Sequence, residues 1–189
     1  ANLADLWIDN RTTVWSKDEV SQLCNEIEQS WNFSSNLDSC EARLIVQGAM
    51  FLTVDNEDRI INSLWHGISP NANADRIWMP GGHSEGDLAI SDNEIVIDAH
   101  VVEVLDLAIG DEITISASGS SMNYTIVGYG YHTNHIFMAP EGSMFPPEPG
   151  EYVLGYLSES GIARLTGNEI GDSNLSLIHI SEPTRPNFI

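Results

Sequence analysis

The stretch from Asp92 to Tyr131 changes its pattern of apolar and polar residues several times in quick succession. A β-branched run at Glu94–Asp98 predicts a short strand, and the amphipathic segment Ala99–Leu105 predicts one or two helical turns. Gly110 must then turn the chain out of a helix-like conformation into a new strand, a step that favours the positive φ angle of glycine. We expect the rest of the chain to be arranged around this unit.

A predicted β-hairpin completes the unit. Its strands are expected at Glu112–Ser116 and Met122–Tyr131, and Gly119–Ser121 supplies the turn. Apolar and aromatic residues alternate with others in the second strand until Gly128 breaks the period. The whole unit is thus a strand, a short helix and two further strands.

This unit resembles the periplasmic core domain of MacB-like and FtsX-like ABC transporter permeases, a group that includes lipoprotein-releasing permeases. Three segments carry the resemblance: the strand Glu94–Ile97, the helix and turn at Val104–Ile113, and the hairpin strand Tyr124–Gly128. The chain departs from the family at Asp106, where the family usually has glycine. A weaker resemblance extends from about Leu3 to Gly167.

The resemblance implies an α+β fold in which a small β-rich lobe is inserted into a split α/β lobe. The α/β, or porter-like, lobe would comprise residues 1–74 and 148–174, as a βαββ unit with a returning strand and helix. The β-rich, or sabre-like, lobe would comprise residues 75–147. Polar, turn-rich residues at Pro70–Ala74 fit a boundary between the two lobes.

The elements of the α/β lobe can also be predicted from local patterns. A strand is expected at Leu3–Asn10, and the capping box Ser16–Glu19 predicts the start of a helix. A long strand follows at Cys40–Val54, whose continuous apolar centre Leu44–Phe51 predicts burial on both faces, and Arg59–Ile68 returns beside it.

The remaining elements are a brief edge strand and the returning pair. The edge strand is expected at Arg76–Met79, and the returning strand at Tyr152–Leu157. Ser158 then caps a helix that ends at Gly167.

The last residues have a different origin in our interpretation. Leu175–Arg185, which reads LSLIHISEPTR, resembles the translation of a transposon-based sequencing adapter. We therefore set residues 175–189 aside as a non-native tail, which implies assembled environmental or shotgun DNA as the source and a metagenomic fragment as the chain. The alternative is a native apolar strand at Leu175–Ile180.

The charge of the chain is strongly negative. Of its 189 residues, 28 are Asp or Glu and 7 are Lys or Arg, giving a formal net charge of −21. Such a surface repels nucleic acids and anionic lipid headgroups, so we expect no nucleic-acid partner. This acidity also suits a saline environment, where salt screens the self-repulsion.

Membrane attachment is expected from the family rather than from this sequence. No stretch approaches the roughly 20 apolar residues that span a bilayer, and the missing initiating Met fits a piece whose anchor lay upstream. The resemblance implies a domain at the cell membrane, on its periplasmic or extracellular side. Its partners would be an ABC ATPase subunit reached through missing transmembrane helices, a second permease copy, and an extracytoplasmic substrate or partner protein.

The two cysteines leave two alternatives open. Cys24 falls on the apolar face of the predicted helix and Cys40 begins the following strand. An extracytoplasmic domain allows a disulfide between them, which would stabilise the fold by about 3 kcal/mol in the chain-entropy model. Two buried free thiols are the other alternative.

Catalytic and metal-binding motifs find little support. His132 and His135 have a spacing that a zinc or copper site could use, but their loop lacks a third ligand at fixed spacing, so we expect no metal. Gly119–Ser121 lacks the second glycine of a nucleophile elbow, and no phosphate-binding helix or lysine follows Gly81–Gly82. We therefore predict no catalytic residue and no cofactor.

A proline-rich loop is the candidate partner-binding surface. Met144 and Phe145 lie among the prolines of Pro140–Pro149, on a connection unsuited to the interior of a sheet. Exposed apolar residues on a stiff loop can bind a partner. Alternatively, these two side chains fasten the loop to its lobe.

Three functions follow from these observations. The first is the extracytoplasmic domain of an ABC permease, which would couple cytoplasmic ATP hydrolysis to the handling of a substrate or partner outside the membrane. The domain itself would not be an enzyme, because the ATPase would reside elsewhere. The alternatives are a secreted, stand-alone binding module and a metal-dependent hydrolase.

Overall fold

The structure is a computed structural model that describes residues 4–10, 12–30, 37–54, 57–79, 85–132 and 145–180. Within these residues the fold is α+β, as predicted, with a large sheet and short helices. The elements, in chain order, are β1 (Leu6–Asp9), α1 (Lys17–Ser30), β2 (Leu37–Val54), β3 (Glu57–Gly67), β4 (Ile77–Trp78), β5 (Glu94–Asp98), α2 (Ala99–Val102), β6 (Glu112–Ala117), β7 (Ser120–His132), β8 (Tyr152–Leu157), α3 (Glu159–Thr166) and β9 (Leu175–Ile180). None of the described helices is long and apolar enough to cross a membrane.

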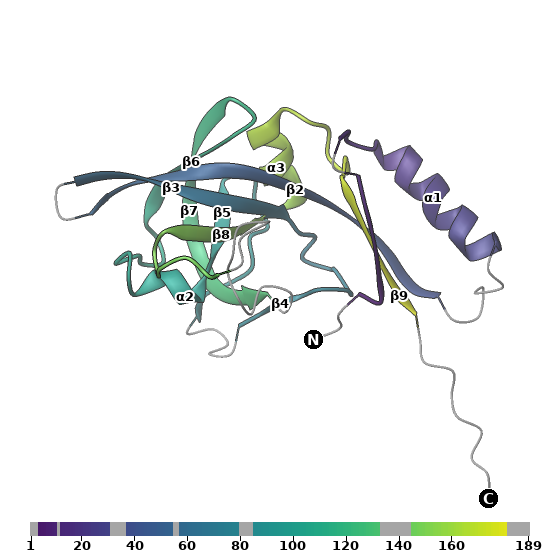
Figure 1. Cartoon of the computed structure of the whole chain (residues 1–189), viewed down its shortest axis with the longest axis horizontal. Helices are drawn as coiled ribbons and strands as arrows, with labels where there is room; N and C mark the ends of the chain where they lie inside the picture. Colours follow the sequence, from purple (N-terminus) through teal and green to yellow (C-terminus); the bar gives the residue numbers. More distant parts are fainter. Residues whose placement is uncertain are drawn as a thin grey trace, which may run out of the picture.

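The strands follow the order β1-β9-β2-β3-β8-β5-β7-β4, and β6 pairs with both β2 and β7. The antiparallel β2–β3 hairpin runs along the length of the molecule, with α1, β1 and β9 near one end and β5, β6 and β7 toward the other (Figure 1). Strands β3 and β8 are parallel, as are β5 and β7, whereas β5 and β8 are antiparallel. The sheet is therefore mixed.

Caps define the helix ends as the sequence predicted. At α1 the Ser16 backbone N–H donates to Glu19 Oε2 at 2.8 Å, and the Glu19 N–H donates to Ser16 Oγ at 3.4 Å, which completes the capping box. The bond from the Ser16 N–H stabilises the carboxylate and lowers the pKa of Glu19. At α3 the Ser158 hydroxyl accepts from the Gly161 N–H, and Gly167 ends the helix with φ of 74°.

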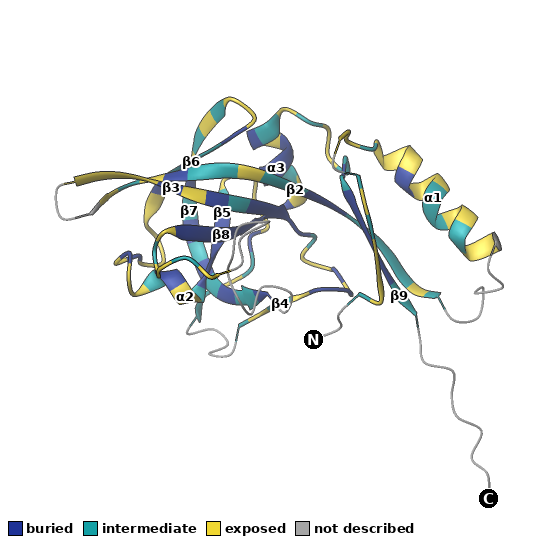
Figure 2. Ribbon diagram, viewed as in Figure 1, coloured by how far each residue is buried: buried dark blue, intermediate teal, exposed yellow. Residues whose placement is uncertain are grey.

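The main core lies around Trp65, which is fully buried. Gly48 and Gly155 make room for its indole, since a Cβ at Gly48 would lie 2.3 Å from Trp65 Nε1 and one at Gly155 would lie 2.6 Å from the ring. The indole N–H donates to the Ser116 carbonyl at 3.0 Å and so joins β3 to β6. Figure 2 shows buried residues concentrated on β3, β5 and β8, and exposed residues on α1 and toward the hairpin tip.

This core contains side chains from both predicted lobes. Leu44, Met50 and Trp65 belong to the predicted α/β lobe, and they share one cluster with Ile95 and Ile113 of the predicted β-rich lobe. Strand β8 likewise pairs with β3 on one side and β5 on the other. The division into residues 1–74 with 148–174 and residues 75–147 stays a prediction.

The first strands have a neighbour that the prediction left out. Strand β9 lies between β1 and β2, so that Ile178 is opposite Leu6 on one side and Cys40 on the other. The segment Leu175–Ile180, which belongs to neither predicted lobe, is thus built into the sheet, and Leu177 and Ile178 are each 1% exposed. Its backbone groups pair with the inner edges of β1 and β2. The origin of residues 175–189 in a translated adapter stays a prediction.

The prediction that β2 is buried on both faces is wrong. Among its described side chains only Arg43, Leu44 and Met50 are buried, and Phe51 is exposed. The reason is that Leu44, Val46 and Met50 pack on the core from one face of the strand, whereas Gln47 and Phe51 on the other face are exposed.

Candidate functional site

A cavity of about 400 Å³ opens where β3 ends and the chain turns toward β4. It is lined by Ile68–Ala72, Arg76–Ile77, Leu88–Ala89 and Tyr156–Leu157, and we call it the linker pocket. Its volume falls in the range of roughly 300 to 1,000 Å³ that small-molecule sites occupy. The linker pocket is therefore the candidate binding site of this domain.

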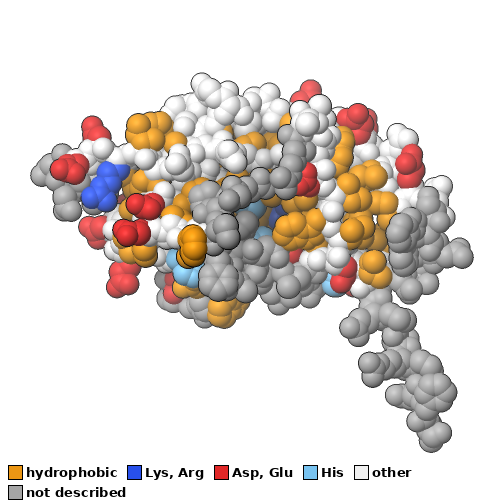
Figure 3. Space-filling model, viewed as in Figure 1, with side chains coloured by type: hydrophobic (Ala, Val, Ile, Leu, Met, Phe, Trp, Pro, Cys, Tyr) orange, Lys and Arg blue, Asp and Glu red, His pale blue; other side chains and the backbone are white. Residues whose placement is uncertain are grey.

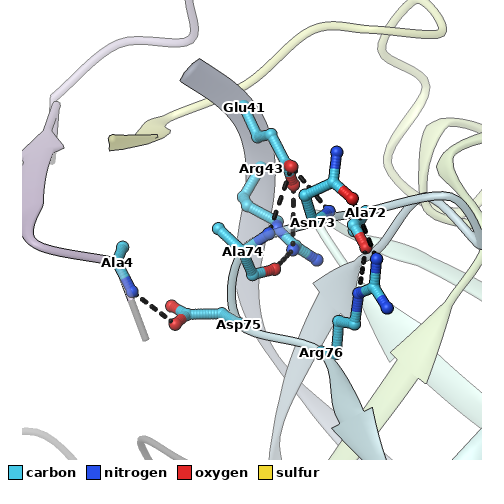
Figure 4. A network of polar contacts seen from close by, with 8 residues as sticks. All are labelled: Ala4, Glu41, Arg43, Ala72, Asn73, Ala74, Asp75 and Arg76. Carbon is cyan, nitrogen blue, oxygen red and sulfur yellow. Dashed lines mark hydrogen bonds and ion pairs between the residues drawn. The ribbon is translucent and has the colours of Figure 1, made fainter. Parts of the chain in front are cut away.

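Arg76 supplies the charge of the linker pocket. Its Nε–H donates to the Ala72 carbonyl at 2.6 Å, and its Nη2 donates to Asn73 Oδ1 at 2.8 Å (Figure 4). None of the described residues that line the pocket is Asp or Glu. This is unusual for a chain with 28 acidic residues, which outnumber the basic ones on the face shown in Figure 3.

A second group of contacts holds the turn on which Arg76 depends. Glu41 Oε1 accepts from the backbone N–H groups of Asn73 and Ala74, at 2.6 and 3.1 Å (Figure 4). Arg43 is buried at 3% exposure, and its Nη2 donates to the Ala74 carbonyl at 2.6 Å and lies 3.6 Å from Glu41 Oε2. Burial lowers the pKa of the Arg43 guanidinium, and the nearby Glu41 and Asp75 carboxylates oppose this change.

Tyr156 lines the linker pocket and is buried. Its ring packs against His66 and His132, with centroids 5.5 and 5.7 Å away. The Tyr156 hydroxyl donates to Asp98 Oδ2 at 3.5 Å, and Asp98 Oδ1 accepts from His100. The pKa of Tyr156 is raised well above its usual value, mainly by burial and also by the nearby Asp98 carboxylate. The phenol is therefore neutral and donates its proton to the hydrogen bond with Asp98.

The predicted histidine pair is divided between described and undescribed parts of the chain. His132 ends β7 and is buried, with its ring 5.6 Å from that of His66. His135 lies outside the described residues. Across the parts of the chain that the structure describes, no group of three or more His, Cys, Asp or Glu side chains could hold a metal ion.

The predicted partner-binding pair is divided in the same way. Phe145 is 76% exposed, the largest exposed fraction among the exposed large apolar residues, and Pro146 beside it is also exposed. Met144 lies outside the described residues. Whether the pair binds a partner or fastens the loop to its lobe stays a prediction.

The two cysteines are not among the described residues that line the linker pocket, and they join α1 to β2. Cys24 and Cys40 form a disulfide with a Cα–Cα distance of 5.9 Å. The bond fastens the mostly exposed helix α1, whose only buried apolar residue among those described is Val20, to the sheet.

Sequence reasoning missed the residues of the linker pocket. It assigned Pro70–Ala74 to a polar linker and Arg76 to an edge strand, and neither pattern indicates a cavity. One signal was available, since Arg76 is one of only 7 basic residues and follows a stretch rich in turn-forming residues. Tyr156 carried no signal, because a tyrosine in an apolar strand is typical of any core.

No family model and no curated protein matches the chain. Among solved structures, it is similar to the periplasmic region of MacB from Actinobacillus actinomycetemcomitans, with a TM-score of 0.46, 10% identity, and coverage of 95% of this chain and 69% of that chain. It is also similar to the extracellular domain of the noncanonic ABC-type transporter YknZ from Gram-positive bacteria, with a TM-score of 0.42, 12% identity, and coverage of 92% and 75%. A third similar structure is a domain of a proposed permease protein from Porphyromonas gingivalis. Its TM-score is 0.38 and its identity 11%, and the match covers 79% of this chain and 63% of that chain.

Proposed function

We propose that this chain is an extracytoplasmic domain of an ABC transporter permease of the MacB, FtsX or lipoprotein-releasing type. The observation that carries the proposal is the way the three family-like segments meet in space. Glu94 and Ile95 of the first segment lie opposite Thr125 and Ile126 of the third. The Gly110 N–H of the second segment donates to the Ile126 carbonyl at 2.8 Å.

The backbone of the connecting turn supports the same proposal. Gly110 has φ of 98°, as its role in the turn predicted. Asp106, which stands where the family usually has glycine, has φ of 51°, and this conformation is one that glycine adopts most easily. At position 106 the side chain therefore differs from the family, whereas the backbone keeps the conformation that a glycine there would adopt.

The role of such a domain would be mechanical and binding work. An ABC ATPase in the cytoplasm would act on it through transmembrane helices, and a second permease copy could stand beside it. Phe145, with Met144, would contact the extracytoplasmic substrate or partner protein. An apolar side chain that is exposed in the free domain stabilises a complex by roughly 1.5 to 3 kcal/mol when a partner buries it.

Expression of the complete gene in cells tests the assignment. We expect Glu103→Cys, at an exposed position after α2, to react with a membrane-impermeant maleimide in intact cells, and the protein to co-purify with an ATP-binding subunit. The parent protein is the control, because both of this chain's cysteines are in a disulfide. Labelling only after the cells are opened, or release of the protein into the medium without any membrane fraction, would contradict the assignment.

The partner surface has its own test. Changing Met144 and Phe145 to Ser should leave the unfolding midpoint almost unchanged and impair transport by the complete permease, because contact area at the partner is lost. Ile170→Ser is the matched control, since Ile170 is 63% exposed at a different place in the chain. Unfolding of the double variant, or normal transport by it, would show that the two side chains are core residues or bystanders.

A further inference from the structure

We propose that the linker pocket binds a small amphipathic anion, specifically a carboxylate with an aliphatic or aromatic body. The proposal goes beyond the permease assignment and does not depend on it. It rests on the charge, the walls and the fixed geometry of the pocket.

The charge comes from Arg76 alone. Its Nε and Nη2 are engaged by Ala72 and Asn73, whereas Nη1 has no hydrogen-bond partner among the described residues. No carboxylate of a described residue lies within 4.0 Å of this guanidinium to form an ion pair. A carboxylate ligand can therefore accept a charge-assisted hydrogen bond from Nη1.

The walls accommodate an apolar body behind that headgroup. Ile68, Ala72, Ala89 and Leu157 are buried or nearly so, and the Tyr156 ring adds an aromatic surface. These side chains come from three separate segments of the chain, and together they form the apolar part of the pocket. A ligand with only a charged group would leave this surface in contact with water, so the pocket favours an amphipathic molecule over a simple anion.

The headgroup site is held in place before any ligand arrives. Glu41 and Arg43 fix the backbone of Asn73 and Ala74, and that same turn supplies both acceptors of the Arg76 guanidinium. Little side-chain freedom is then lost when a ligand binds, which lowers the cost of association. The net charge of −21 repels an anionic ligand, but at physiological salt this repulsion is screened beyond about 8 Å. The direct contact between the ligand and Arg76 Nη1 is much shorter and is not screened in this way.

The test is a titration of the full 189-residue chain at physiological ionic strength with octanoate, with octanamide as its neutral isostere and with acetate as the headgroup alone. We expect octanoate to bind about ten- to a hundredfold more tightly than octanamide, the range set by one hydrogen bond to a charged group. Acetate should not saturate in the same concentration range. In an NMR spectrum, backbone amides of the Ile68–Ala72 segment should shift with octanoate.

Three variants distinguish binding in the linker pocket from an effect of the protein's overall charge. Arg76→Gln should weaken octanoate binding about tenfold or more and leave octanamide binding unchanged. Arg59→Gln makes the same charge change at an exposed position of β3 and should alter neither. Ala89→Phe, which fills the apolar part, should weaken both ligands in a chain that retains its far-UV circular dichroism. Absence of saturable octanoate binding, equal affinity for octanamide, or equal losses in the two arginine variants would overturn the proposal. Each of these results would leave the permease assignment intact, since the titration needs no membrane.

Discussion

Asp106 lies in the family-like unit and has a φ of 51°, in the left-handed region that residues other than glycine seldom adopt. A short polar side chain tolerates this region better than most, and a β-branched side chain tolerates it poorly. The identity of this residue therefore matters through backbone sterics more than through any contact of its side chain.

This conformation gives the first prediction at the scale of single residues. Asp106→Gly should change the free energy of unfolding by no more than about 1 kcal/mol, because relief of strain offsets the greater freedom of the unfolded chain. Asp106→Val should destabilise the fold by about 1 to 2 kcal/mol more than the glycine variant. Denaturant melts of the two variants measure the difference, and equal stability of both would show that the turn relaxes into another conformation.

Tyr124 gives the second residue-scale prediction. Its ring is buried, its hydroxyl donates to the Gly161 carbonyl at 2.8 Å, and burial raises the pKa of Tyr124 to about 12. Between pH 10 and 12 the unfolded chain ionises at this phenol while the folded chain does not, so the free energy of unfolding should fall as the pH rises through this window. Below pH 10 both states are protonated and the contribution is constant.

Denaturant melts at a series of pH values from neutral to 12 measure this loss. Tyr124→Phe should be less stable at neutral pH, because the bond to Gly161 is lost, and its stability should decline less steeply above pH 10. A decline as steep as that of the parent chain would assign the alkaline loss to other groups, among them Tyr156, which is equally buried and whose pKa is also raised.

At the scale of elements, β9 has the largest predicted effect. Leu175, Leu177 and Ile178 are buried between β1 and β2, and each stabilises the fold by roughly 1.5 to 3 kcal/mol. A chain that ends at Asn174 should therefore lose much of a stability that is typically about 5 to 15 kcal/mol for a whole domain. A chain that ends at Ile180 is the control and should be as stable as the parent in thermal melts.

This experiment also bears on the origin of the tail. If the chain that ends at Asn174 were as stable as the parent, β9 would add nothing to the sheet, and the adapter interpretation of residues 175–189 would gain support. A large loss would show that these residues complete the sheet whatever their origin, because without them the inner edges of β1 and β2 lose their hydrogen-bond partners.

At the scale of the whole molecule, the shared core determines how the domain unfolds. Trp65 and Met50 pack in the same cluster as Ile95 and Ile113, and β8 joins β3 to β5. We expect a single cooperative transition, with near-UV and far-UV circular dichroism giving the same midpoint. Two separated transitions would instead indicate two lobes that fold independently, as a strict reading of the predicted boundaries implies.

Local sequence patterns were sufficient to predict several of the elements. The ranges of β5 and β8, the caps at Ser16 and Ser158, and the turn at Gly110 all follow from side-chain alternation, capping hydroxyls and the backbone freedom of glycine. These interactions join residues a few positions apart, so their signal is contained in the sequence.

Which strands are neighbours, and where a cavity lies, became clear from the three-dimensional fold. The place of β9 between β1 and β2 depends on segments separated by most of the chain, and no local pattern specifies that pairing. The linker pocket likewise brings Arg76 beside Leu88 and Tyr156. Arg76 meets a partly apolar cavity because β3 and β8 are parallel neighbours, and that pairing is settled by the packing of the whole core around Trp65 rather than by any single segment.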